Sequence, residues 1–117
     1  MRRVTDCLFC KIVAKEIPAD VVLETDRVLA FRDINPQAPT HVLVIPKEHF
    51  RDAAAMAAAD DGWADDVLQA GHAVAEQEGV AESGYRLVFN TGAAAGQAVF
   101  HVHLHVLGGR SLTWPPG

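Results

Sequence analysis

The stretch FHVHLHVL, residues 100–107, places histidines at every second position, namely His101, His103 and His105. In an extended strand, side chains two residues apart point to the same side of the sheet. We therefore expect the imidazoles to share one face, while the apolar side chains between them pack on the other. Burying three imidazoles without hydrogen-bond partners would cost about 1–3 kcal/mol each. The imidazole face is thus expected to line a cleft or to hold an ion.

The spacing alone leaves three uses for this face open. The imidazoles can be solvated side chains on an exposed sheet, or they can chelate a metal ion, as paired histidines do in zinc hydrolases. They can also serve nucleophilic catalysis, in which a neutral imidazole attacks phosphorus while its neighbours bind the phosphate oxygens.

A glycine-rich segment, NTGAAAGQAVF at residues 90–100, directly precedes the histidines. Gly92 and Gly96 permit the tight backbone that aims N–H groups at an anion, and Asn90 and Gln97 add side-chain donors. On spacing alone, the glycines are equally compatible with a plain turn between two strands. Next to the histidines, the segment favours a phosphate-binding loop.

Length and composition are those of one globular domain, which we assign to residues 1–117. Apolar residues make up 50% of the chain and charged residues 21%. A net charge of −5 argues against nucleic-acid binding, which needs a basic face. No apolar run reaches the roughly 18–20 residues that span a bilayer, and the first residues lack the apolar core of a signal peptide. We expect a cytoplasmic protein that binds neither membranes nor nucleic acid.

Hydrophobic periodicity and turn residues predict the order helix, three strands, helix, two strands. The long helix is expected to be capped by Asp60 or Asp61. Helices are expected over residues 8–15 and 61–78, with a short helix or helical connection over 52–60. Strands are expected over residues 20–25, 27–34, 40–46, 85–90 and 98–109. Because tight turns favour antiparallel pairing, this order predicts an α+β domain with helices packed on an antiparallel sheet.

Two cysteines, Cys7 and Cys10, form a C-x2-C pair. In a reducing compartment such a pair favours metal binding or redox chemistry over a structural disulfide. Two thiolates are half of a tetrahedral zinc site, so the pair by itself does not decide between these uses.

The motif HVHLHVL resembles the His-φ-His-φ-His-φ-φ pattern of the histidine triad (HIT) family, in which φ is an apolar residue. The likeness extends to KEIPAD, LAFRDINPQAPTHVLVIPKEH, GYRLVFNTG, GQAVFHVHLHVLGGR and the ending WPPG. Together these segments most closely resemble the Hint branch, the histidine triad nucleotide-binding proteins. The resemblance implies a five-stranded antiparallel sheet with two main helices. It also implies a homodimer, paired through the long helix and a strand into a continuous ten-stranded sheet.

The same resemblance implies a purine nucleotide site that hydrolyses the P–N bond of nucleoside 5′-phosphoramidates, such as AMP-NH2 or AMP joined to a lysine amine. His103 matches the nucleophile, which would form a nucleotidyl-histidine intermediate that water then cleaves. His105, Gln97 and Asn90 match phosphate contacts, and Asp33 matches the carboxylate that holds the ribose hydroxyls. The positions that match the base pocket and the rest of the nucleotide site are Phe9, Ile12, Phe31, Ile34, His41, Leu43, Gly96, Ala98 and Val99.

The resemblance also gives the cysteine pair a role, because many bacterial relatives carry a structural zinc. The matching ligands here are Cys7, Cys10, His49 and His101, a set that suits tetrahedral zinc. The alternative is two buried thiols beside a surface histidine, as in relatives that fold without metal.

One position departs from the family pattern. Ala98 stands where close relatives often carry a serine whose hydroxyl contacts the phosphate or leaving-group region. Loss of one neutral hydrogen bond, worth about 0.5–1.5 kcal/mol, predicts slower turnover rather than none. Two other functions therefore stay open: a dinucleoside polyphosphate hydrolase of the same family, and a nucleotide-binding regulatory protein with vestigial activity.

Overall fold

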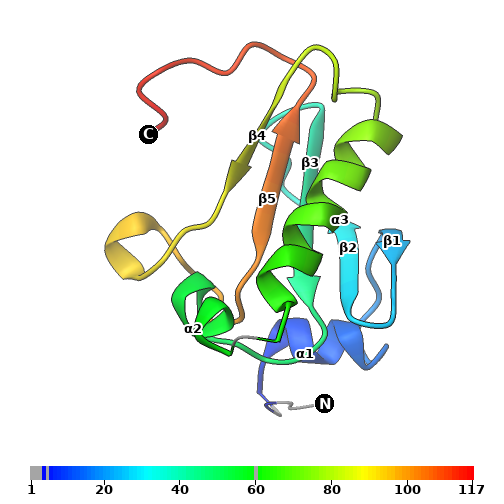
Figure 1. Cartoon of the computed structure of the whole chain (residues 1–117), viewed down its shortest axis with the longest axis vertical. Helices are drawn as coiled ribbons and strands as arrows, with labels where there is room; N and C mark the ends of the chain where they lie inside the picture. Colours follow the sequence, from blue (N-terminus) through cyan, green and yellow to red (C-terminus); the bar gives the residue numbers. More distant parts are fainter. Residues whose placement is uncertain (1–3, 5, 60) are drawn as a thin grey trace.

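Five strands form one antiparallel sheet in the computed structural model, which describes residue 4 and residues 6–59 and 61–117. The spatial order of the strands is β1-β2-β3-β5-β4, and every neighbouring pair is antiparallel (Figure 1). The predicted α+β class and the five-stranded antiparallel sheet are confirmed. The strands are β1 (Val21–Glu24), β2 (Val28–Arg32), β3 (Thr40–Pro46), β4 (Tyr85–Val88) and β5 (Leu104–Gly108).

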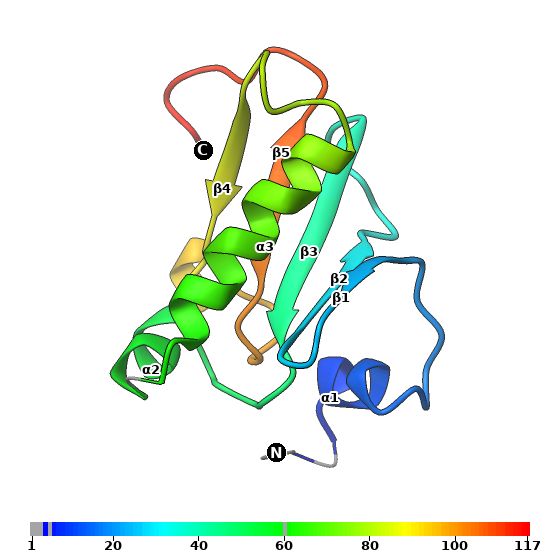
Figure 2. The same ribbon diagram turned by 45° about the vertical axis from the view of Figure 1, so that its right-hand side comes forward.

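Helices cover both faces of this sheet. The long helix α3 (Trp63–Gln77) lies along one face, and the short helix α1 (Leu8–Val13) packs near one end of β2 and β3 (Figure 2). The other helical segments are α2 (Ala53–Ala58) and the 3-10 turn η1 (Ala93–Ala95). None of the described helices is long and apolar enough to cross a membrane.

Alternation along the strands divides the core into two clusters. In β2, Val28 and Ala30 join the cluster under α3, whereas Leu29 and Phe31 join a second cluster that includes Phe9 of α1. The histidine motif obeys the same rule, because its apolar residues Val102, Leu104 and Val106 are buried in the α3 cluster. The histidines between them therefore face the α1 side of the sheet.

The last strand is shorter than the predicted range 98–109, because pairing with β3 begins only at Leu104. The backbone ahead of it bonds instead to the segment that follows β3: the N–H of Val102 donates to the carbonyl of Phe50 over 2.7 Å. His101 and His103 thus lie just before the strand, and only His105 lies within it.

The end of the first helix and the start of the long helix also differ from the predicted positions. The first helix ends at Val13 rather than Lys15, because Lys15 adopts a left-handed φ of 65°. There the N–H of Glu16 donates to the carbonyl of Lys11 over 2.9 Å, the pattern of a Schellman ending. The long helix begins at Trp63, with Gly62 at its N-cap and no side-chain cap.

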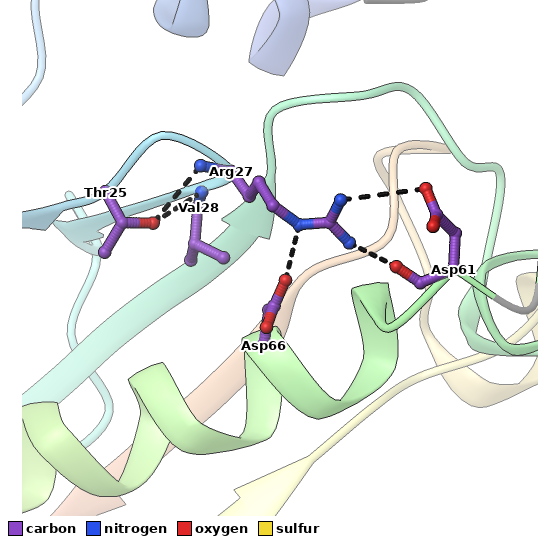
Figure 3. Close-up of polar contacts among 5 residues, drawn as sticks. All are labelled: Thr25, Arg27, Val28, Asp61 and Asp66. Atoms are coloured by element: carbon purple, nitrogen blue, oxygen red, sulfur yellow. Dashed lines mark hydrogen bonds and ion pairs between the residues drawn. The ribbon is translucent and has the colours of Figure 1, made fainter.

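The prediction that Asp61 caps α3 is therefore wrong. The other predicted cap, Asp60, lies outside the described residues. A distant arginine stabilises the first turn instead. Arg27, in the loop between β1 and β2, donates to the carbonyl of Asp61 and to the carboxylate of Asp66, as Figure 3 shows. Its guanidinium also lies 3.8 Å above the ring of Trp63. The β1–β2 hairpin is thereby fastened to the start of α3.

Candidate functional site

A cavity of about 310 Å³ lies on the α1 side of the sheet, beside the start of β5. It groups all the residues matched to the nucleotide site except Gln97 and His41. Its lining residues are Leu8, Phe9, Ile12, Phe31, Arg32, Asp33, Ile34, Leu43, Asn90, Gly96, Ala98, Val99, His103 and His105. Leu8 and Arg32 were not among the residues expected from the sequence. Leu8 is one helical turn from Ile12, so the periodicity of α1 could have indicated it.

Aromatic rings form one wall of this cavity. Phe9 packs edge-on against Phe31, with ring centroids 5.5 Å apart, and against His103 at 5.1 Å. Ile34 is fully exposed. A flat apolar group of the size of a purine can pack against this wall. Such packing is favourable because it removes apolar surface from water.

The backbone determines which nitrogen of His103 is free. Its Nδ1 lies 2.9 Å from the carbonyl oxygen of His101. A carbonyl only accepts, so Nδ1 carries the proton and Nε2 holds the lone pair of the neutral ring. His103 therefore presents a nucleophilic nitrogen on the side of the ring opposite to its backbone anchor.

A chain of hydrogen bonds determines the tautomer of His105. The backbone N–H of Gln37 donates to Nδ1 of His41 over 3.0 Å, so the proton of His41 is on Nε2. That nitrogen lies 2.9 Å from Nδ1 of His105, which must accept. The proton of His105 is therefore on Nε2, a buried atom with no hydrogen-bond partner in the described structure. His41 does not line the cavity; it orients His105 from behind.

Burial keeps these rings neutral at pH 7. The pKa of His105 falls to about 4, first because the ring is buried and then because His103 and His41 lie beside it, while Asp33 acts in the opposite direction. Burial likewise lowers the pKa of His41, and Asp33 partly offsets the effect. The unpaired Nε2–H of His105, on a ring that lines the cavity, suits an anionic ligand.

Asp33 lies at the edge of the cavity, in the turn after β2. Its Oδ1 accepts from the backbone N–H of Asn35 over 2.8 Å, and its Oδ2 lies 3.4 Å from Nε2 of His41. A carboxylate oxygen can accept more than one hydrogen bond, so acceptor capacity remains for a vicinal diol. Asp33, His41 and His105 are close enough to share a metal ion. Such an ion would need a lone pair on Nε2 of His41. In the tautomer that Gln37 imposes, that nitrogen carries the proton instead.

The amide of Gln97 is engaged within the loop rather than in the cavity. Its Oε1 accepts from the backbone N–H of Gly92 over 2.9 Å, and its Nε2 donates to the carbonyls of Arg51 and Val99 over 2.8 and 3.1 Å. Gly92 and Gly96 flank η1 with φ values of 87° and 89°, a region that favours glycine. Gln97 therefore holds the glycine-rich loop in shape, while Gly96 and Ala98 reach the cavity.

The two cysteines and two of the histidines form a second cluster, at the N-terminal end of α1. The four ligand atoms all lie within 4.8 Å of one another. Nδ1 of His101 is 3.4 Å from Sγ of Cys7 and 3.5 Å from Sγ of Cys10, which is 3.4 Å from Nδ1 of His49. Zn–S bonds of about 2.3 Å and Zn–N bonds of about 2.0 Å in a tetrahedron separate S from N by about 3.5 Å. The donor set therefore fits zinc in both identity and spacing.

The tautomer of His101 agrees with this fit. Nε2 of the ring lies 2.9 Å from the carbonyl of Pro46, so Nε2 carries the proton and Nδ1 points its lone pair at the thiols. The ring is completely buried, and burial lowers its pKa to about 4. His101 is thus neutral at pH 7, its Nδ1 lone pair could bind a metal ion, and its orientation is set by the end of β3.

Comparison with known proteins identifies the family. Residues 14–112 match the HIT domain family, so the chain belongs to the HIT family, as the histidine motif predicted. It is 46% identical over 107 residues to the purine nucleoside phosphoramidase of Escherichia coli K12, covering 92% of this chain and 90% of that protein. It is 49% identical over 123 aligned residues to the 14 kDa zinc-binding protein of Zea mays, covering 100% of this chain and 94% of that protein.

A solved structure agrees. The HIT family hydrolase from Legionella pneumophila Philadelphia 1 has a TM-score of 0.92 to this chain at 53% identity, covering 96% of this chain and all of that one (100%). Within the HIT family, these similarities place the chain in the Hint-like branch.

Proposed function

We propose that this protein hydrolyses the P–N bond of purine nucleoside 5′-phosphoramidates through a nucleotidyl intermediate on His103. The observation that carries the proposal is the pairing of two fixed tautomers at one cavity. His103 offers a lone pair on Nε2, and His105 offers an unpaired N–H on Nε2. The first suits attack on phosphorus, and the second suits binding of a phosphoryl oxygen.

In the first step, Nε2 of His103 attacks the α-phosphorus and forms an N–P bond. The bond from phosphorus to the amine breaks, and the amine leaves with a proton taken from solvent. In the second step, water attacks the same phosphorus, the N–P bond to His103 breaks, and the attacking water gives a proton back to solvent. The products are the nucleoside monophosphate and His103 in its neutral state. The carbonyl of His101 holds the ring in one orientation throughout.

The remaining cavity residues bind and orient the nucleotide. Phe9 and Phe31 supply an apolar wall for the purine, and the Asp33 carboxylate accepts from the ribose hydroxyls. The backbone of the glycine-rich loop, which Gln97 holds in shape, supplies donors to the phosphoryl oxygens.

Two assembly features belong to the same proposal. Cys7, Cys10, His49 and His101 hold a structural zinc ion, which cross-links α1 to the segments after β3 and before β5. The protein pairs as a homodimer through α3 and the edge strand β4, joining two sheets into one. The fit of the four ligand atoms supports the first feature; exposed leucines on α3 and β4 support the second.

The proposal predicts that His103→Asn removes turnover and keeps nucleotide binding. Asparagine retains a polar side chain but has no imidazole nitrogen to attack phosphorus, so hydrolysis of adenosine 5′-phosphoramidate should fall by at least about a thousandfold. Affinity for AMP, measured by calorimetry, should change little. The control is His72→Asn, which replaces a histidine of α3 outside the cavity. Undiminished turnover in His103→Asn would rule out the nucleophile.

The chemistry of the leaving group separates the proposal from its closest alternative. A wild-type preparation should hydrolyse the phosphoramidate with a higher kcat/KM than a diadenosine polyphosphate. The reverse order would make the protein a dinucleoside polyphosphate hydrolase. Binding of AMP with no hydrolysis of either compound would favour the regulatory role.

A further inference from the structure

The turn between β2 and β3 supplies two backbone donors to the nucleotide site. The N–H of Gln37 donates to Nδ1 of His41 over 3.0 Å, and the N–H of Asn35 donates to Oδ1 of Asp33 over 2.8 Å. His41 in turn donates to Nδ1 of His105, whose unpaired Nε2–H faces the ligand in the proposed function. The position of this turn therefore bears on how His105 is presented to a phosphoryl oxygen.

The turn is not held by the sheet at this point. His41 lies in the ladder between β3 and β5, opposite Leu107, so its backbone is fixed relative to the strand that carries His105. Gln37 lies ahead of β3, which begins at Thr40. Its own side-chain amide bonds within the turn, to the carbonyl of Asn35 over 3.0 Å. Another group must therefore keep the N–H of Gln37 against His41.

The segment that follows β5 supplies that group. The guanidinium of Arg110 donates twice to the carbonyl of Gln37, from Nε over 3.2 Å and from Nη2 over 3.1 Å. Its Nη1 donates to the carbonyl of Ser111 over 2.9 Å. Because the guanidinium is a rigid planar fork, two bonds to one carbonyl restrain the direction of that carbonyl as well as its distance. Arg110 thus fastens Gln37 to the end of β5.

Gly109 brings this segment close to the turn. Its φ of 88° lies in the left-handed region that favours glycine. A Cβ at this position would lie 2.9 Å from Cβ of Pro39 and 3.5 Å from the backbone nitrogen of Thr40. The backbone after β5 therefore packs directly on the last residues of the turn, while Arg110 bonds to its middle.

We propose that Arg110 is a positioning residue, which acts through Gln37 and His41 to keep the proton of His105 on Nε2. The inference rests on the proposed function only for the use of that proton at phosphorus, because the tautomer is a property of the free protein. Without Arg110, the N–H of Gln37 no longer points steadily at Nδ1 of His41, and the proton of His41 can move to Nδ1. His105 must then donate from its own Nδ1 and turn a lone pair toward the phosphoryl oxygen.

Nitrogen NMR of the histidine rings tests the proposal in the free protein, because the shifts of Nδ1 and Nε2 differ between the two neutral tautomers. The spectra are compared at pH 7 for the wild type, Arg110→Gln, Arg110→Lys and Arg86→Gln. Arg86 is the matched control. It also donates to backbone carbonyls of the segment after β5, those of Leu112 and Thr113, rather than to the turn.

In the wild type, His41 and His105 should carry the proton on Nε2, and His103 should carry it on Nδ1. In Arg110→Gln, the signals of His41 and His105 should shift together toward the other tautomer. His103 is an internal control, because the carbonyl of His101 anchors it independently of the turn. Its signals should keep the wild-type shifts.

The two other variants separate the role of the guanidinium from a general effect on the chain end. Arg110→Lys retains a cation that can donate to the same carbonyl, so its spectrum should lie between those of the wild type and Arg110→Gln. Arg86→Gln should match the wild type. The kcat for adenosine 5′-phosphoramidate should follow the same order and fall about threefold to tenfold in Arg110→Gln, the effect of losing one neutral hydrogen bond in the transition state.

Wild-type shifts of His41 and His105 in Arg110→Gln would overturn the proposal. An equal change in Arg86→Gln would also overturn it, because the effect would then come from a loosened chain end. If the wild type does not hydrolyse the phosphoramidate, the proposed function fails, and the ring spectra still decide whether Arg110 sets the tautomer.

Discussion

Single hydrogen bonds to the backbone orient the rings at both centres of this protein. The carbonyl of His101 fixes His103, the N–H of Gln37 fixes His41, and the carbonyl of Pro46 fixes His101. In each case the backbone group is a pure donor or acceptor, so it allows one neutral tautomer only. Neighbouring imidazoles of one motif therefore serve different purposes: the first ring presents Nδ1 to the thiols, and the second presents Nε2 to the cavity.

The depressed pKa of His105 predicts a dependence of stability on pH. The pKa is about 4 in the folded protein and about 6.5 in the unfolded chain, so the unfolded state binds more protons as the pH falls below 6.5. The free energy of unfolding should therefore decrease between about pH 6.5 and pH 4, by up to about 1.4 kcal/mol per pH unit from this ring. Urea unfolding at a series of pH values measures the effect.

The contribution of His105 is obtained from a variant. His105→Asn removes the titrating ring, so its stability should fall less steeply than that of the wild type over this pH range. Parallel curves for the wild type and His105→Asn would contradict the assigned burial of the ring.

At this scale, the sequence predicts residue type and neighbourhood better than orientation. The alternation in HVHLHVL is enough to put Leu104 in the core and His105 on the opposite face. It does not indicate that the amide of Gln97 turns away from the cavity toward Arg51, a partner 46 residues away. Nor does it indicate the order of donors from Gln37 to His105, because that order depends on distances between separate strands and turns.

At the scale of elements, local patterns locate helices and strands, and long-range contacts determine their ends. The alternating pattern runs without interruption from residue 98, yet β5 begins only at Leu104. The reason is that the pairing of β3 with β5 stops at Val44, which pairs with Leu104. The sequence places a helix near residue 61, but the start at Trp63 depends on Arg27, which arrives from another hairpin. Such boundaries follow from tertiary pairing, which periodicity does not contain.

Loss of zinc is expected to destabilise the short helix α1 more than any other element. It has only 6 residues, too few for independent stability. Two of the proposed ligands, Cys7 and Cys10, belong to its N-terminal end, and Phe9 between them forms a wall of the nucleotide cavity. Removal of the ion is therefore expected to loosen the helix and the cavity together.

Metal analysis and thermal unfolding test this expectation. The purified protein should contain about one equivalent of zinc, and a chelator should lower Tm by at least about 5 °C, because metal that binds only the folded state stabilises it. Added zinc should restore the Tm of the wild type but not that of Cys10→Ser. Less than about half an equivalent of zinc in a metal-replete preparation, or no change in Tm, would count against the site.

At the scale of the whole molecule, the sheet has two edges of different character. β1 forms one edge and β4 the other (Figure 1). Leu87 of β4 is 37% exposed, and Leu68 of the neighbouring helix α3 is 43% exposed. Leu87 also approaches α3 at Gly71, where the Cβ of any larger residue would lie 3.5 Å from the Cδ2 of Leu87. An unpaired edge strand next to apolar side chains is a surface that proteins usually cover.

The proposed homodimer uses this surface, and paired substitutions at the two edges test it. The wild type should sediment as a particle of twice the chain mass of 12.6 kDa. Leu87→Glu should raise the dimer dissociation constant at least about tenfold, because symmetry brings two new carboxylates into one apolar interface without partners. Val21→Glu is the matched control: Val21 is 41% exposed on the opposite edge strand β1, so the same change there should leave the dimer intact. A wild type that is monomeric at micromolar concentration, or equal loss of the dimer in both variants, would show that β4 is not the interface.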